Sequence, residues 1–247
     1  MIEIHGLTKR YGDFTAVHDL SFAVQPGEVM GLVGPNGAGK TTTLRCATGI
    51  IPPSLGAIRI AGFDLATDPV EAKRRLAFFP DEPRLFDHLT VEQHLNFVAR
   101  LYGVADWRDR ATPILAELEM GDKRQALPAE LSRGMKQKLV IACGLLHLPS
   151  VIFFDEPLTG LDPGGIRHMK GTMRRLAREG AAIILSSHLL SLLEEVCTHV
   201  LILKAGEKVA DGTIAGIRER FATHPDSSLE DVFFRATEDA PSPPLLP

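Results

Sequence analysis

A glycine-rich segment ending in a lysine and two threonines is the part of the chain that points most directly to chemistry. It follows the apolar run 29–33 and precedes apolar residues at helical spacing, Leu44, Ala47 and Ile51. A strand, a glycine-rich loop and a helix that begins with Lys and Thr form the pattern of a phosphate-binding P-loop. Its glycines let successive backbone N–H groups face one phosphate chain, and the helix N-terminus adds partial positive charge. We therefore expect a nucleoside triphosphate on Gly34, Pro35, Asn36, Gly37, Ala38, Gly39, Lys40, Thr41 and Thr42.

Two side chains of this loop have separate expected roles. Lys40 would reach the β- and γ-phosphates, and the hydroxyl of Thr41 would be a ligand of Mg²⁺. The alternative is a glycine-rich turn that matches the pattern by chance, and the strand and helix expected on either side argue against it. The sequence thus predicts that Mg²⁺ accompanies the nucleotide.

A pair of carboxylates follows a second apolar run. The run 151–154 is continuous, as expected for a strand buried on both faces, and it ends in Asp155, Glu156 and Pro157. In α/β sheets ligands bind at the carboxyl ends of parallel strands. We expect Asp155 to hold Mg²⁺ beside Thr41, and Glu156 to orient or deprotonate an attacking water. Taken alone, these residues could equally begin an ordinary loop; the P-loop upstream favours the functional interpretation.

The segment 131–139 adds a resemblance to a known family. Ser132 is expected to cap a helix whose apolar face includes Met135, Leu139 and Ala142. Its sequence, Leu-Ser-x-Gly upstream of the Asp-Glu pair, is similar to the signature motif of the ATP-binding cassette (ABC) family. The resemblance implies that the nucleotide is ATP, and that Ser132 and Gly134 face the γ-phosphate held by the P-loop of a second subunit. A helix N-terminus with a capping hydroxyl suits that anion.

Three further residues match family positions in chain order. Tyr11 stands where an aromatic ring stacks on adenine, although an aromatic residue in an exposed turn is the alternative. Asp162 resembles the D-loop residue at the dimer interface, and it could also cap the helix that begins at Pro163; both interpretations can hold. His188, at the end of a strand, resembles the switch histidine that contacts the γ-phosphate. The resemblance thus assigns catalytic roles to Glu156, His188 and Lys40.

The chain departs from the family pattern at two places. Asp81 occupies the position of the usual Gln in the segment that links the core to the helical block, and we expect it to take over a metal and coupling role. Arg133 and Met135 resemble a signature variant of subunits that serve ABC-2 type, exporter-like permeases, and the segment 229–233 resembles a tail of the same subgroup.

The predicted function is therefore an ATP-hydrolysing subunit that works as a sandwich dimer with an integral membrane permease. The second ATP-binding subunit is either another copy or a paralogue, and export is the expected direction. Alternatives are a soluble ABC ATPase acting on ribosomes or DNA, and a catalytically inactive regulatory cassette. The presence of Lys40, Asp155, Glu156 and His188 argues against the inactive cassette.

Composition and charge argue against nucleic-acid binding, a CxxC site and a membrane-spanning segment. The 247 residues carry a net charge of −4, which gives no basic field for nucleic acid, and the three cysteines are too far apart for a CxxC pair. No apolar run reaches the roughly 18 residues that span a bilayer, and the N-terminus does not resemble a signal peptide. We expect a subunit that is soluble by itself, in a reducing compartment, at the cytoplasmic face of the membrane.

The expected fold class is α/β, a P-loop NTPase core with a mixed, mainly parallel sheet. An antiparallel β subdomain should form from the N-terminal strands and feed the P-loop strand, and an α-helical subdomain should be inserted at about 83–150. Thr90 and Gln93 have the spacing of a capping box at a helix start. The ATPase domain is expected to span 1–220, with a C-terminal tail over 221–247 that is disordered from Ala236 onward.

Overall fold

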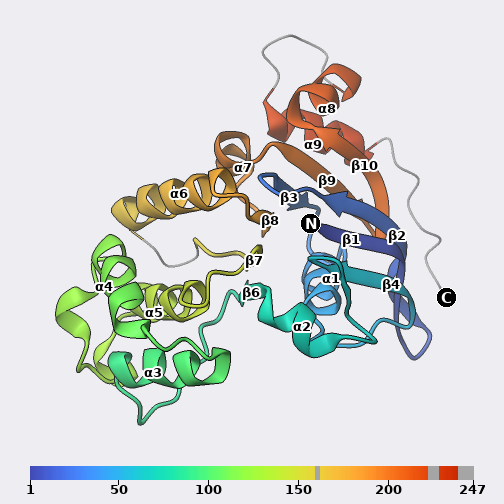
Figure 1. Ribbon diagram of the computed structural model, residues 1–247. Coiled ribbons are helices and arrows are strands. Elements are labelled where there is room, and N and C mark those ends of the chain that lie inside the picture. Colours follow the sequence, from blue (N-terminus) through green and yellow to red (C-terminus); the bar gives the residue numbers. More distant parts are fainter. Residues whose placement is uncertain (159–161, 222–227, 239–247) are drawn as a thin grey trace.

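Two β-sheets and a group of helices make up the computed structural model, which describes residues 1–158, 162–221 and 228–238 (Figure 1). The larger sheet has six strands in the order β10-β9-β3-β8-β7-β6. Its strands are β3 (Val29–Val33), β6 (Leu76–Phe79), β7 (Val151–Asp155), β8 (Ala182–Ser186), β9 (His199–Lys204) and β10 (Glu207–Thr213). All pair in parallel except β10, which forms an antiparallel hairpin with β9.

The smaller sheet is antiparallel and has the strand order β2-β1-β4-β5. Its strands are β1 (Ile2–Tyr11), β2 (Phe14–Val24), β4 (Leu55–Ile60) and β5 (Phe63–Asp64). The predicted N-terminal pairing is confirmed for β1 and β2. The chain then leads from β2 into the P-loop strand β3, as predicted, and β3 pairs with β8 and β9 in the larger sheet.

Alternate residues of β7 show why its sequence is continuously apolar. Val151 and Phe153 belong to the apolar cluster shared with the antiparallel sheet, whereas Ile152 and Phe154 belong to the cluster shared with the inserted helices. Successive side chains of a strand point to opposite faces, so a strand covered on both sides must be apolar at every position. The six-stranded sheet thus lies between two cores.

Helices fill the connection between β6 and β7. They are α3 (Val91–Tyr102), α4 (Trp107–Glu117) and α5 (Arg133–Leu145), with two short 3₁₀ turns at Gly121–Lys123 and Pro128–Glu130. The predicted capping box at the start of α3 is confirmed: Thr90 Oγ1 accepts from the backbone N–H of Gln93, whose side chain accepts from the N–H of Thr90. Figure 1 shows these helices grouped beside β6 and β7, away from the antiparallel sheet.

The remaining helices of the described chain lie outside this connection. They are α1 (Lys40–Ala47), α2 (Pro69–Arg74), α6 (Pro163–Arg178), α7 (Leu190–Val196), α8 (Ile214–Phe221) and α9 (Leu229–Glu238). Within the described residues, none of the helices has both the length and the apolar composition that crossing a membrane requires.

The C-terminal part of the described chain is more ordered than predicted. Disorder was expected from Ala236 onward, and this is wrong for Ala236, which lies in α9 and is only 1% exposed. The hydroxyl of Ser228 accepts from the N–H of Asp231, whose carboxylate accepts from the N–H of Ser228, and this reciprocal pair starts the helix. Leu229, Val232 and Ala236 then repeat on one buried face. Residues 239–247 lie outside the described part of the chain.

Candidate active site

The P-loop forms the turn from β3 into α1, and close contacts require glycine at two of its positions, Gly34 and Gly39. A Cβ atom on Gly34 would lie 2.5 Å from the carbonyl oxygen of Leu203, and one on Gly39 would lie 2.6 Å from that of Ala16. Gly39 also has a φ of +97°, in the region that favours glycine. The strand, loop and helix predicted from the sequence are therefore present. A side chain at Gly34 or Gly39 would collide with the backbone of a neighbouring segment.

Lys40 folds back over the loop that precedes it. Its Nζ donates to the carbonyl oxygens of Gly34, at 2.6 Å, and Pro35, at 3.1 Å. Burial lowers the pKa of Lys40, while the nearby carboxylates of Glu156 and Asp155 act in the opposite direction. The ammonium group is thus held at the loop with the two predicted carboxylates close enough to influence it.

Asp155 occupies the end of β7 and is buried next to two hydroxyl groups. Ser186, its register partner on β8, donates to Asp155 Oδ1 at 2.6 Å, and Thr41 Oγ1 donates to the same oxygen at 3.5 Å. The structure therefore brings together Thr41 and Asp155, which are 114 positions apart in sequence. Sequence reasoning missed the role of Ser186 in fixing Asp155; its signal was its position at a strand end, shortly before His188.

Glu156 and His188 form a pair at the same edge of the sheet. The Nδ1 atom of His188 lies 2.8 Å from Glu156 Oε2, with the imidazole exposed and the carboxylate mostly shielded. Because a carboxylate can only accept, Nδ1 carries the proton in this contact. Glu156 has a φ of +50°, and its backbone N–H donates to the carbonyl of Ser186 at 3.1 Å. A positive φ is uncommon for a residue other than glycine, and here it occurs directly after the strand end that carries Asp155.

Asp81 lines the same pocket as the predicted metal ligands. The pocket has a volume of about 790 Å³, and Thr41, Asp81 and Asp155 are among its lining residues. The carboxylate of Asp81 is 3.3 Å from the guanidinium of Arg133. Among the described residues no group of three or more His, Cys, Asp or Glu side chains could hold a metal ion. Nucleotide-bound Mg²⁺ generally uses one or two carboxylates together with phosphate oxygens, and the oxygen donors here fit that chemistry.

Ser132, Asp162 and Tyr11 lie on separate elements from the P-loop. Ser132 caps α5, accepting from the N–H of Met135 at 3.3 Å, and Asp162 caps α6, accepting from the N–H of Gly165 at 2.9 Å, so both predicted caps are confirmed. Gly134 lies in the first turn of α5. Tyr11 is half exposed at the end of β1, with Lys9 Nζ 5.0 Å from its ring centroid. Leu161, beside Asp162, lies outside the described residues.

The fold and this site define a nucleotide-binding protein of the P-loop class, with an antiparallel sheet and a helical insertion added to the core. The chain belongs to the ABC transporter family, whose profile matches residues 17–159. It is an ATP-binding and ATP-hydrolysing subunit of that family, which confirms the resemblance drawn from the sequence.

Curated relatives match along most of the chain. It is 34% identical to the ABC-type transporter ATP-binding protein EcsA of Bacillus subtilis, over 97% of both proteins. It is 38% identical to the Nod factor export ATP-binding protein I of Burkholderia thailandensis, over 85% of this chain and 70% of that protein.

Solved structures agree with the fold. The structure of an ATP-binding subunit of an ABC transporter superposes with a TM-score of 0.91 at 36% identity, covering 96% of this chain and 99% of that one. A dimeric ATP-binding cassette solved in a post-hydrolysis state with ADP and Pi has a TM-score of 0.79 at 20% identity, covering 87% and 99%, which is a likeness of fold alone.

Proposed function

We propose that two ATP-binding subunits close over two ATP molecules, and that this closure drives an integral membrane permease. The observation that carries the proposal is the separation of two phosphate-binding features within one chain. The P-loop lies between β3 and α1, and Lys40 begins α1, whereas Ser132 caps α5 of the helical insertion. Within the described residues, Ser132 makes no hydrogen bond to the P-loop. Each chain then supplies one half of two different sites, and ATP joins them.

The roles of the site residues follow from their contacts. Lys40 would exchange the carbonyl oxygens of Gly34 and Pro35 for the β- and γ-phosphates, since its Nζ already lies at the loop. Glu156 would accept a proton from the attacking water, and His188 would hold that carboxylate and approach the γ-phosphate. Tyr11 would stack on adenine, and Asp162 would lie at the dimer interface, while it caps α6.

Mg²⁺ would be held by Thr41 and Asp155, with Asp81 at the same pocket. When bound, Mg²⁺ neutralises charge on the phosphates and thereby eases attack at the γ-phosphorus. The hydrogen bond from Ser186 keeps the Asp155 carboxylate oriented toward Thr41.

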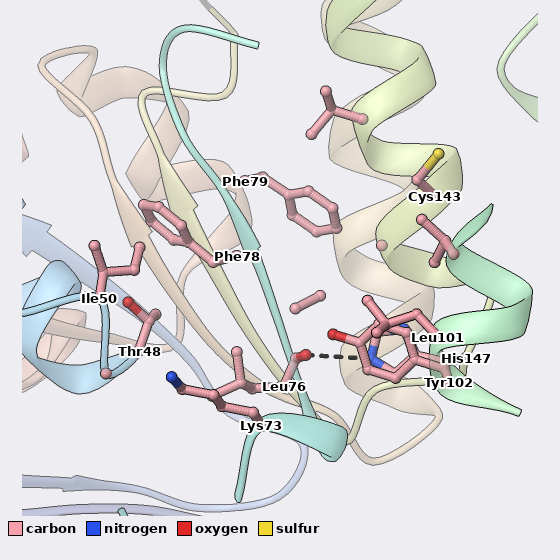
Figure 2. A pocket seen from close by; sticks show the side chains of 15 residues that line it. Thr48, Ile50, Lys73, Leu76, Phe78, Phe79, Leu101, Tyr102, Cys143 and His147 are labelled. Carbon is pink, nitrogen blue, oxygen red and sulfur yellow. Dashed lines mark hydrogen bonds between the residues drawn. The ribbon is translucent and has the colours of Figure 1, made fainter. Parts of the chain in front are cut away.

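The surface that meets the permease is proposed to be a second pocket, of about 610 Å³, between the core and the helical insertion. Figure 2 shows Ile50, which follows α1, and Leu101, on α3, on opposite sides of it. Both side chains are exposed, at 55% and 67%, and Phe78 lines the space between them. Exposed apolar side chains around a hollow favour an apolar partner segment, here a loop or short helix of the permease. Such docking would place the subunit at the cytoplasmic face of the membrane.

Export through an ABC-2 type permease is the proposed direction. The variant signature at Arg133 and Met135 supports it, as does the likeness to a relative named for Nod factor export. The competing function, a soluble ATPase acting on ribosomes or DNA, has less support because the relatives reported above are named as transporter or export subunits and the net charge is −4.

The sandwich dimer is tested by the substitution Glu156→Gln. Loss of the proton acceptor with the shape retained should stop hydrolysis while ATP binding persists, so the protein should elute as a dimer with ATP and Mg²⁺ in size-exclusion chromatography. The double variant Lys40→Ala/Glu156→Gln is the control and should remain monomeric, because it has lost the phosphate contact. A Glu156→Gln protein that binds ATP but stays monomeric would contradict the sandwich mechanism.

A further inference from the structure

An ion pair joins two segments that the proposed function assigns to different ATP sites. The Nη2 atom of Arg133 lies 3.3 Å from Asp81 Oδ1. Asp81 lines the pocket shared with Thr41 and Asp155, on the side of the chain's own nucleotide. Arg133 directly follows Ser132, and the start of its helix is the part expected to serve the second subunit. The ion pair therefore connects the two functional surfaces within one chain.

A second contact between α5 and the loop that carries Asp81 lies one helical turn after Arg133, and it is buried. Gln137 Nε2 donates to the carbonyl oxygen of Pro80 at 3.2 Å, and Gln137 is only 2% exposed. Residues four apart on a helix lie on the same face, so Arg133 and Gln137 reach neighbouring residues of the same loop. The side chains of Arg133 and Asp81 are 53% and 46% exposed. The buried amide anchors the loop, while the ion pair lies at the solvent edge.

The charges around the start of α5 explain why Arg133 turns to Asp81. The first turn of α5 contains no acidic residue, and a cation at this end of a helix is disfavoured by the helix dipole. The carboxylate of Asp81 provides the missing countercharge from another segment. Because half-exposed ion pairs contribute little to stability, a competing cation can displace this one at small cost.

We propose that Arg133 is a positioning residue, which holds the Asp81 carboxylate toward α5 and so competes with Mg²⁺ for it. The inference rests on the proposed function, since it requires Mg²⁺ and ATP at the pocket lined by Thr41 and Asp155. Any movement of the signature helix toward the second subunit then alters how readily the chain's own site accepts the metal. The pocket also shares Ile50, Phe78 and Val140 with the proposed permease surface, so the ion pair lies beside both.

The test measures binding of a fluorescent ATP analogue as a function of Mg²⁺ concentration. Arg133→Gln should lower the half-saturating Mg²⁺ concentration about two- to fivefold, the range expected for loss of one half-exposed ion pair. Arg133→Lys should behave like the wild type, because it keeps the charge. Lys136→Gln is the matched control. It removes a cation from the start of the same helix, but Asp81 forms its ion pair with Arg133. It should leave the half-saturating concentration unchanged.

The role of Asp81 is isolated by a double-mutant cycle. In an Asp81→Asn background, Arg133→Gln should no longer shift the Mg²⁺ dependence, because the carboxylate for which arginine and metal compete is gone. A merely structural role would change unfolding by urea equally in both backgrounds without changing the metal dependence. If Arg133→Gln folds poorly, Arg133→Ala serves in its place, since the side chain is half exposed.

The possible results distinguish a failure of this inference from a failure of the proposed function. ATP binding with a Mg²⁺ dependence unaltered by Arg133→Gln, or a shift that persists in the Asp81→Asn background, would overturn this inference and leave the proposed function standing. Failure of the wild-type chain to bind ATP at all would overturn the proposed function and the inference with it.

Discussion

Single residues of the P-loop are constrained by the backbone around them. Gly37 and Gly39 both have positive φ values, +81° and +97°. A Cβ atom on Gly37 would meet nothing within 4 Å, whereas one on Gly39 would lie 2.6 Å from the backbone oxygen of Ala16. Alanine at either position must adopt a left-handed conformation, which costs about 1–2 kcal/mol. Only at Gly39 must the neighbouring backbone also move.

This difference gives a prediction that needs no nucleotide. Gly37→Ala should lower the free energy of unfolding by about 1 kcal/mol, the conformational strain alone. Gly39→Ala should lower it by about 3 kcal/mol, because strain and displacement of the strand that carries Ala16 add together. Urea unfolding of the two variants, followed by circular dichroism without ATP, measures both values. Equal losses at the two positions would show that the contact with Ala16 is relieved without cost.

The site residues show what the sequence could predict at this scale. Lys40, Thr41, Asp155, Glu156 and His188 have the residue types and spacing of known chemistry, so they could be named before the structure, although their roles remain predictions. Contacts that depend on strand register could not. The hydrogen bond from Ser186 to Asp155 exists because β7 and β8 pair at these residues, and the partner of Asp81 depends on how α5 packs against the loop after β6.

At the scale of elements, the start of α3 provides a local test of stability. Thr90→Ala removes the hydroxyl that accepts from the N–H of Gln93 and should lower the free energy of unfolding by about 1 kcal/mol. Thr90→Ser keeps the acceptor and should restore most of the loss. Urea unfolding of both variants measures the difference. If serine is no better than alanine, the cap contributes nothing and the packing of α3 alone determines its start.

Elements with strong local signals were the ones the sequence could predict. The helix starts at Thr90 and Ser132 could be predicted because each cap depends only on residues within three positions of it. The tail was mispredicted because the Pro-rich and acidic composition of 236–247 dominates its pattern, whereas α9 depends on burying Leu229, Val232 and Ala236 against distant parts of the chain. Similarly, only tertiary structure places β3 in a different sheet from β2.

At the scale of the whole molecule, polar contacts tie the helical insertion to the core. Glu117 on α4 accepts from Arg175 and from Thr172 on α6, and His147 after α5 hydrogen-bonds to the carbonyl oxygen of Leu76 on β6 (Figure 2). Burial lowers the pKa of His147, so the ring stays neutral at physiological pH, with Nε2 donating to that carbonyl. The hydrogen bond between His147 and Leu76 thus connects two walls of the pocket proposed to bind the permease, without depending on nucleotide.

Binding at the proposed permease surface can therefore be tested separately from ATP binding. Leu101→Asp puts a charge on an exposed apolar wall of the pocket and should reduce co-purification of the membrane partner at least about tenfold, since burying an unpaired carboxylate at an interface costs more than 1.4 kcal/mol. ATP binding by the isolated subunit should be unchanged, because Leu101 does not line the pocket of Thr41 and Asp155.

The control is Leu55→Asp, which adds the same charge to an exposed leucine on β4, away from the pocket. Should Leu55→Asp weaken the membrane complex and Leu101→Asp leave it intact, the partner binds the antiparallel sheet instead.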